Sequence, residues 1–265
     1  MLRTRVIPFL LLKGRGFYKT VRFSTPTYLG DPINILRIFN DKEVDELFIA
    51  DIGATIANQG PNLPLLRDLA TECFMPLGYG GGVTRLEQAE QLYQIGIEKV
   101  ALNTAAVENP SLVTQIADAV GSQSVVVAID VKRGLFGRYD VVTRGGTRST
   151  GATPVDFARQ MEQRGAGEIV LTAVDRDGTM QGYDLELIES VSSAVSIPVI
   201  ACGGAATVAH LIDAVRIGGA SAVAAGSMFV FHGPRRAVMI NVPDLAPLHD
   251  RDDPSRFGVE PSHHG

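Results

Sequence analysis

Short apolar runs alternate along the chain with longer stretches in which apolar residues recur every three or four positions. The first pattern is typical of buried strands and the second of amphipathic helices. The runs predict eight strands, near residues 5–12, 46–51, 75–80, 98–103, 124–130, 168–173, 197–202 and 221–226. Several of them, such as residues 125–129, are continuously apolar, as expected of strands that are buried on both faces. Eight strands that alternate with helices predict an α/β fold, the (β/α)8 TIM barrel.

The two halves of the chain resemble each other. When residues 5–13 are aligned with residues 124–132, Lys13 falls on Lys132 and Leu11 falls on Asp130. Residues 76–82 match residues 198–204 at nearly the same offset, and both segments end in glycines. A unit that is used twice predicts a barrel built from two half-barrel repeats. The alignment also places leucine in the first half where the second half has an aspartate at a strand end.

This pattern predicts a single barrel domain over residues 1–242, and 265 residues with 45% hydrophobic content are enough for one large core. Residues 243–265 are rich in Asp, Arg, Pro, Ser and His, which predicts a disordered tail. The net charge of −5 argues against nucleic acid as a partner, and no apolar run is long enough to span a membrane. Because Cys73 and Cys202 fit no metal spacing and no signal-peptide pattern is present, we expect a cytoplasmic protein without metal or other cofactor.

Glycine-containing loops follow several of the predicted strands. In a TIM barrel the catalytic face lies at the C-terminal ends of the strands, and glycines before a helix let backbone N–H groups bind an anion there. A glycine pair after a strand is more often only a tight turn, but its repetition in both halves favours two phosphate sites at one barrel mouth. The residues predicted to bind the phosphates are Gly82, Asn103, Thr104, Gly203, Gly204, Gly226 and Ser227.

Charged side chains at the same strand ends are candidates for substrate binding and catalysis. Asp51, Asp130 and Asp177 (beside Gly178) follow strands, although a lone aspartate there is most often a helix cap or a loop hydrogen-bonding group. Asp130 ends a run of five apolar residues, which favours a position facing the mouth and a catalytic role. Lys19 lies in a glycine-flanked loop after the first strand. It is either a mobile lid over the mouth or a solvated lysine, and the sequence leaves both interpretations open.

At the opposite end of the barrel, four of the predicted strands begin with charged residues of alternating sign. Inward-facing charges cost several kcal/mol each unless they are paired. Four unconnected surface charges are the alternative, but the alternation of sign favours a closed ring of salt bridges. The four residues are Arg5, Glu46, Lys99 and Glu168.

The chain resembles the HisF family, the cyclase subunit of imidazole glycerol phosphate synthase, over about residues 1–232. The resemblance is carried by residues 80–82, 103–110, 126–130, 175–187 and 197–204. It implies a lyase/cyclase-type subunit of a glutamine amidotransferase complex, with a glutaminase subunit docked at the barrel bottom. The ring of four charges is then a gate for ammonia, which is used at the barrel top on a substrate with two phosphates.

Leu11 departs from the pattern of this family. In that family two aspartates, at the ends of the first and fifth strands, act as general acid and base. Asp130 matches the second of them, and Leu11 stands at the position of the first. The cyclase activity of this chain is therefore in doubt. Residues 10–13, 30–34 and 229–234 instead resemble a HisF-like branch that occurs with a glutaminase and a sugar amidotransferase making acetamidino sugars for surface polysaccharides. We therefore favour ammonia supply for acetamidino-sugar formation over histidine biosynthesis, with a non-catalytic scaffold for the glutaminase as the third interpretation.

Overall fold

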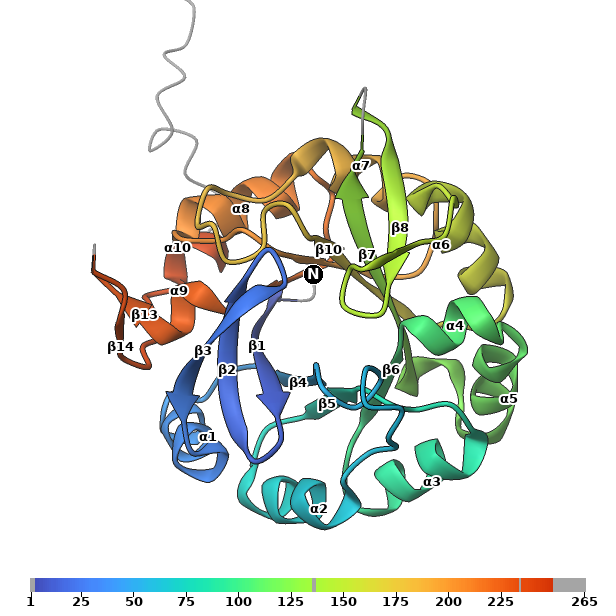
Figure 1. Ribbon diagram of the computed structural model, residues 1–265. Coiled ribbons are helices and arrows are strands. Elements are labelled where there is room, and N and C mark those ends of the chain that lie inside the picture. Colours follow the sequence, from blue (N-terminus) through green and yellow to red (C-terminus); the bar gives the residue numbers. More distant parts are fainter. Residues whose placement is uncertain (1–2, 135–136, 234, 250–265) are drawn as a thin grey trace, which may run out of the picture.

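The computed structural model describes residues 3–134, 137–233 and 235–249, which form a closed (β/α)8 barrel (Figure 1). Its eight parallel strands lie where the sequence predicts them, so the predicted fold is confirmed. In order around the wall they are β1 (Arg5–Lys13), β4 (Leu47–Asp51), β5 (Leu77–Gly80), β6 (Lys99–Leu102), β7 (Val125–Arg133), β10 (Glu168–Ala173), β11 (Val199–Cys202) and β12 (Ala222–Ala225). Pairing of β12 with β1 and of β7 with β10 closes the barrel.

Amphipathic helices cover the outside of the wall between successive strands. They are α1 (Pro32–Asp41), α2 (Leu63–Glu72), α3 (Leu86–Gln94), α5 (Ser111–Val120), α6 (Pro154–Gln163), α7 (Leu185–Ser192) and α8 (Val208–Arg216), with the short 3-10 helix η1 (Ser122–Ser124) before β7. Side chains cap the N-termini of helices α1 and α6. The Asp31 carboxylate accepts the N–H of Asn34 at 3.1 Å, and the Thr153 hydroxyl accepts that of Asp156 at 3.2 Å. Within the described ranges, every helix is too short or too polar to span a lipid bilayer.

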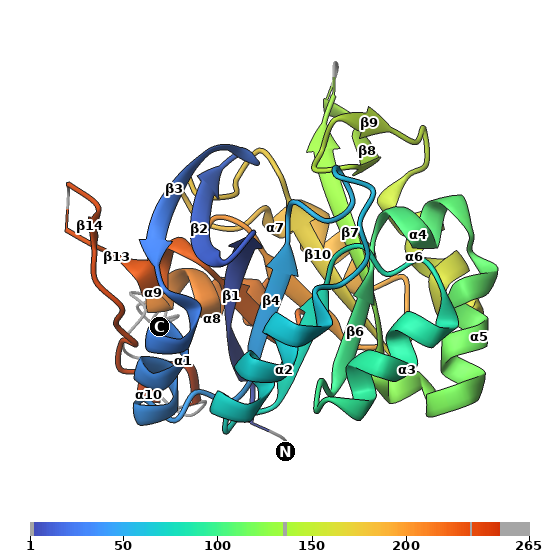
Figure 2. The ribbon, with the colours of Figure 1, turned by 60° about the horizontal axis from the view of Figure 1, so that its bottom comes forward.

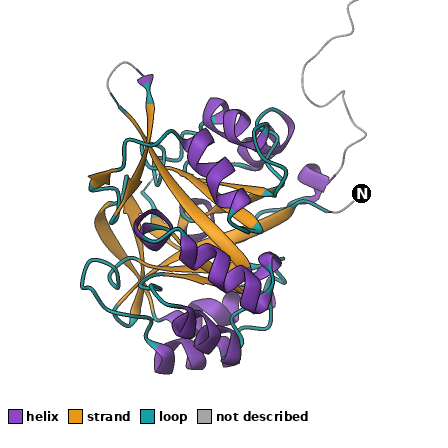
Figure 3. Cartoon of the chain, turned by 90° about the vertical axis from the view of Figure 1, so that its right-hand side faces the viewer, coloured by secondary structure: helices purple, strands orange, loops and turns teal. Residues whose placement is uncertain are grey.

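The half-barrel repeat extends to a pair of hairpins that the sequence did not predict. β1 continues into the antiparallel strands β2 (Gly16–Val21) and β3 (Ser24–Gly30), while β7 continues into β8 (Tyr139–Thr143) and β9 (Arg148–Ser149). Both hairpins rise above the end of the barrel that is opposite the N-terminus (Figure 2), and a side view separates the two ends in the same way (Figure 3). The mouth of the barrel is therefore flanked by two β-hairpins.

Short elements replace an eighth long helix in the described chain. After β12 come α9 (Ser227–Val230), the hairpin of β13 (Phe231–His232) and β14 (Ala237–Val238), and α10 (Ala246–His249), which fill the space between α8 and α1 (Figure 1). Residues 243–249 fall in the predicted disordered tail, but α10 and the buried Leu248 show that the ordered chain continues through them. The rest of the predicted tail, residues 250–265, lies outside the described residues.

The hydrophobic core has one part between the wall and the helices and a second part inside the barrel. The interior is filled by side chains of very different size, from Phe48 and Ile200 to Ala222. The ring of Phe48 stacks on that of Phe9, with centroids 5.1 Å apart and planes inclined by 1°. Gly78 makes room for this stack, because a Cβ at this position would lie 2.4 Å from the Phe48 ring.

We expect Gly78→Ala to lower the free energy of unfolding by about 1–3 kcal/mol, because the added methyl group overlaps the Phe48 ring. A second substitution, Phe48→Leu, should recover part of this loss in the double variant. Denaturant unfolding of both single variants and the double variant measures the coupling. Gly53→Ala is the control, since its Cβ meets no atom closer than 3.5 Å. Equal stability of Gly78→Ala and the unmodified protein would contradict this packing.

Candidate functional site

Asp130 lies on the inner face of β7, at the mouth of the barrel. Val126 and Ala128, on the same face of the strand, belong to the barrel interior. The Asn103 amide donates to the Asp130 carboxylate at 3.2 Å and to the Ala128 carbonyl at 2.9 Å. Asp130 is half-buried. The position predicted for this residue is confirmed.

The Asp130 carboxyl holds its proton more tightly than an ordinary aspartate. Burial raises its pKa from 3.8 to about 7, and the nearby negative charge of Asp177 adds to this rise. Hydrogen bonds from Thr172 and Asn103 lower the pKa, but less than burial raises it. A carboxyl group with a pKa near neutrality is suited to general acid and base catalysis.

Lys19 is neither a mobile lid nor a solvated lysine, so both interpretations of this residue are wrong. It lies on strand β2, is 5% exposed, and its amino group donates to both carboxylate oxygens of Asp177, at 2.8 and 3.0 Å. The Thr20 hydroxyl also donates to Asp177, at 3.3 Å. Gly178 allows this close approach, since a Cβ there would lie 2.2 Å from the Thr20 carbonyl oxygen. The first hairpin is thus joined to the loop after β10 by a buried ion pair.

Leu11 occupies the position in the first half-barrel that Asp130 occupies in the second. It continues the inward-facing series of Ile7 and Phe9 along β1, pairs with Tyr18 of β2, and is 8% exposed. Its isobutyl group can neither donate nor accept a proton. Proton transfer at the mouth therefore has an ionisable group on the β7 side and none at the matching place on β1.

The loops after β5 and β6 contain the residues that are predicted to bind the first phosphate. Gly82 has a φ of +69°, and a Cβ there would lie 2.3 Å from the Gln59 carbonyl oxygen. Asn103 precedes the short helix α4 (Thr104–Glu108), and the buried Thr104 hydroxyl accepts the N–H of Arg144 from the second hairpin at 3.2 Å. The two segments lie on neighbouring strands, as the sequence predicts.

The loops after β11 and β12 contain the residues that are predicted to bind the second phosphate. Gly203 and Gly204 have φ angles of +92° and +116°, and a Cβ at Gly204 would lie 2.2 Å from the Gly182 carbonyl oxygen. Ser227 is 3% exposed, and its hydroxyl has no hydrogen-bond partner among the described residues. A buried hydroxyl without a partner is costly, so this group is available for a ligand.

Asp51 mainly organises its own loop. One of its carboxylate oxygens accepts the N–H groups of Gly53 and Ala54, at 2.9 and 3.0 Å. This is the loop hydrogen-bonding role that is common for an aspartate after a strand. The arrangement leaves its other oxygen for a ligand.

Two residues of the mouth were missed by the sequence reasoning. The Thr172 hydroxyl contacts both Asp130 and Cys202, and burial raises the pKa of the Cys202 thiol to about 12. Alternation along β10 and β11 would have revealed them, because Val170 and Ile200, two residues earlier, face the barrel interior. Because its pKa lies far above 7, the Cys202 thiol is neutral at physiological pH.

Within the described residues, no group of three or more His, Cys, Asp or Glu side chains is placed to hold a metal ion.

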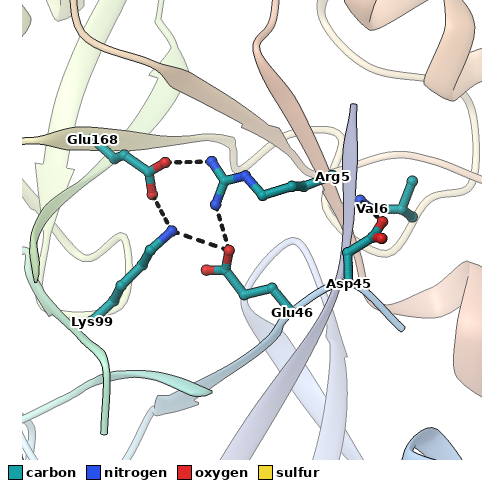
Figure 4. A network of polar contacts seen from close by, with 6 residues as sticks. All are labelled: Arg5, Val6, Asp45, Glu46, Lys99 and Glu168. Carbon is teal, nitrogen blue, oxygen red and sulfur yellow. Dashed lines mark hydrogen bonds and ion pairs between the residues drawn. The ribbon is translucent and has the colours of Figure 1, made fainter. Parts of the chain in front are cut away.

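At the other end of the barrel, Arg5, Glu46, Lys99 and Glu168 form the predicted closed ring (Figure 4). The Arg5 guanidinium bridges the two glutamates, and the Lys99 amino group donates to Glu46 at 3.0 Å and to Glu168 at 2.7 Å. Burial alone would lower the pKa of Arg5, but the two carboxylates outweigh it and raise the pKa. One oxygen of Glu46, Oε1, is buried and has no hydrogen-bond partner.

Comparison with known proteins agrees with this arrangement. Residues 5–234 match the family described as histidine biosynthesis protein. A protein of Pseudomonas aeruginosa, provisionally named imidazole glycerol phosphate synthase subunit hisF2, is 53% identical over 248 residues, which cover 94% of this chain and 99% of that protein. The imidazole glycerol phosphate synthase subunit HisF of Alkaliphilus metalliredigens is 42% identical over 253 residues, with 95% and 98% covered. The chain therefore belongs to the histidine biosynthesis protein family, as a HisF-like barrel.

Proposed function

We propose that this chain is the barrel subunit of a glutamine amidotransferase system and that it receives ammonia from a glutaminase docked at the barrel bottom. The ammonia crosses the barrel interior and is delivered at the mouth for acetamidino-sugar formation. The closed ring of Arg5, Glu46, Lys99 and Glu168 is the observation that carries this proposal.

A ring of buried charges stabilises a barrel no better than apolar packing does. Replacing buried ion pairs by well-packed apolar side chains is often neutral or stabilising, so the ring needs another reason. A gate must exclude bulk water and yet offer polar contacts to a small molecule. The unpaired Glu46 oxygen offers one such contact. Above the ring, the apolar barrel interior disfavours charged species and suits neutral ammonia.

The arrangement of the mouth favours a ligand with two phosphate groups. The site at Gly82, Asn103 and Thr104 and the site at Gly204 and Ser227 lie on different sides of the barrel axis, with Asp130 between them along the wall. The unpartnered Ser227 hydroxyl favours an acceptor-rich group in the second site. Asp51, Lys19 and Asp177 complete the polar lining that we assign to substrate binding.

Leu11 favours acetamidino-sugar formation over histidine biosynthesis. A lyase and cyclisation reaction needs proton transfer on both sides of its substrate, and only Asp130 provides it here. A sugar amidotransferase is then the protein that uses the ammonia. The alternative is an imidazole glycerol phosphate synthase cyclase, which is supported by the retained Asp130 and by the 42% identity to the subunit of Alkaliphilus metalliredigens.

The alternative is tested by restoring the missing carboxylate. We expect little cyclase turnover with ammonia and the bisphosphate substrate, and a gain of about 10²–10⁴-fold in Leu11→Asp, because a second proton-transfer group is regained. Leu11→Asn is the matched control, since its amide has a similar shape but cannot take a proton. Rapid turnover by the unmodified protein would favour the histidine pathway. Absence of a gain in Leu11→Asp would show that this residue alone does not limit the reaction.

The gate is tested in the complex with the glutaminase and the ammonia acceptor. Lys99→Leu opens the ring on one side and leaves Glu46 and Glu168 with fewer donors, so we expect glutamine hydrolysis to lose its coupling to product formation. The measurement is product formed per glutamine hydrolysed. Lys42→Leu, which removes an exposed charge at the end of α1 outside the ring, should stay coupled. Normal coupling in Lys99→Leu, or failure of barrel and glutaminase to co-purify, would count against the channel and favour the scaffold.

A further inference from the structure

Lys19 connects the second phosphate site to Asp177. Its aliphatic stem lies over Gly226, since a Cβ at that glycine would be 3.0 Å from the Lys19 Cε atom. Beyond this point the amino group reaches both carboxylate oxygens of Asp177. Gly226 directly precedes Ser227, whose buried hydroxyl is unpartnered. Gly226 and Ser227 thus adjoin the Lys19 side chain whose ammonium group pairs with Asp177.

Asp177 in turn acts on Asp130 through its charge. Its negative charge favours the protonated form of Asp130. The Lys19 ammonium is ion-paired with that same carboxylate, at 2.8 Å. Three side chains beside Asp130 carry no charge. Asn103 on β6, Thr172 on β10 and Cys202 on β11 are neutral, and Lys132 on β7 donates to the Gly146 carbonyl at 2.6 Å.

We propose that Lys19 and Asp177 form an electrostatic relay, in which an anion bound at Gly204 and Ser227 draws the Lys19 ammonium away from Asp177 and Asp130 takes up a proton from solvent. Asp177 is thus a positioning residue for the proton on Asp130. The relay rests on the phosphate site of the proposed function and adds to it a coupling between ligand binding and acid catalysis. No bond is made or broken other than this proton transfer.

The relay predicts uptake of a fraction of a proton when an anion binds near pH 7. Sulfate is the probe, because its own charge does not change near neutral pH. Titration calorimetry in two buffers that differ in their heat of ionisation measures the proton uptake. The unmodified protein should take up protons, whereas Asp130→Asn should bind sulfate without uptake. Lys19→Gln removes a cation beside the site, so it should bind sulfate more weakly and, at saturating sulfate, take up no proton. Lys13→Gln is the control, since Lys13 is an exposed cation at the same mouth that is not bonded to Asp177.

A second measurement does not depend on variants that could fold poorly. The ¹³C resonance of the Asp130 carboxyl, followed against pH in the unmodified protein, should report a higher pKa with sulfate than without it. Sulfate binding without proton uptake and without this shift, or uptake that persists in Lys19→Gln, overturns the relay and leaves the phosphate site intact. Failure of the unmodified protein to bind sulfate overturns both.

Discussion

Closure of a parallel barrel forces every second residue of each strand to face inward, and this constraint places all the chemistry of the molecule. Along β1 the inward series begins with Arg5, continues with Ile7 and Phe9, and ends with Leu11. One strand therefore contributes to the charged ring, the apolar interior and the mouth in turn. Three further inward series begin at the ring, with Glu46 before β4, Lys99 on β6 and Glu168 on β10, so a polar bottom and a polar top are separated by an apolar middle.

Buried charges are neutralised differently at the two polar ends of the barrel. The ring at the bottom contains two cations and two anions and is neutral as a whole. At the mouth, Lys19 neutralises Asp177, but Asp130 has no cation of its own and responds by holding its proton. Compensation keeps the ring at the bottom neutral as a whole, whereas the carboxyl of Asp130 at the mouth can change its charge. This difference matches a gate at one end and chemistry at the other.

The sequence predicts most features that depend on local pattern. The eight strands, the inward position of Asp130 and the four-membered ring follow from apolar runs, strand ends and the repeat. The hairpins were missed because residues 16–30 mix polar and apolar side chains without a buried face that is recognisable in isolation. Lys19 was misread for a related reason: its partner Asp177 lies 158 residues away, and only the folded chain brings them together.

The C-terminal segment makes one sector of the barrel unlike the rest. Between α8 and α1 the described part of the chain covers the wall with two four-residue helices and a hairpin of two-residue strands instead of a long helix. Short elements have few internal hydrogen bonds and depend on a small number of apolar anchors such as Phe229 and Leu248. Local opening on the slow timescale of amide hydrogen exchange should therefore begin in this sector. Strand β1 and the start of the ring would then be exposed to solvent before the opposite side of the barrel loses its structure.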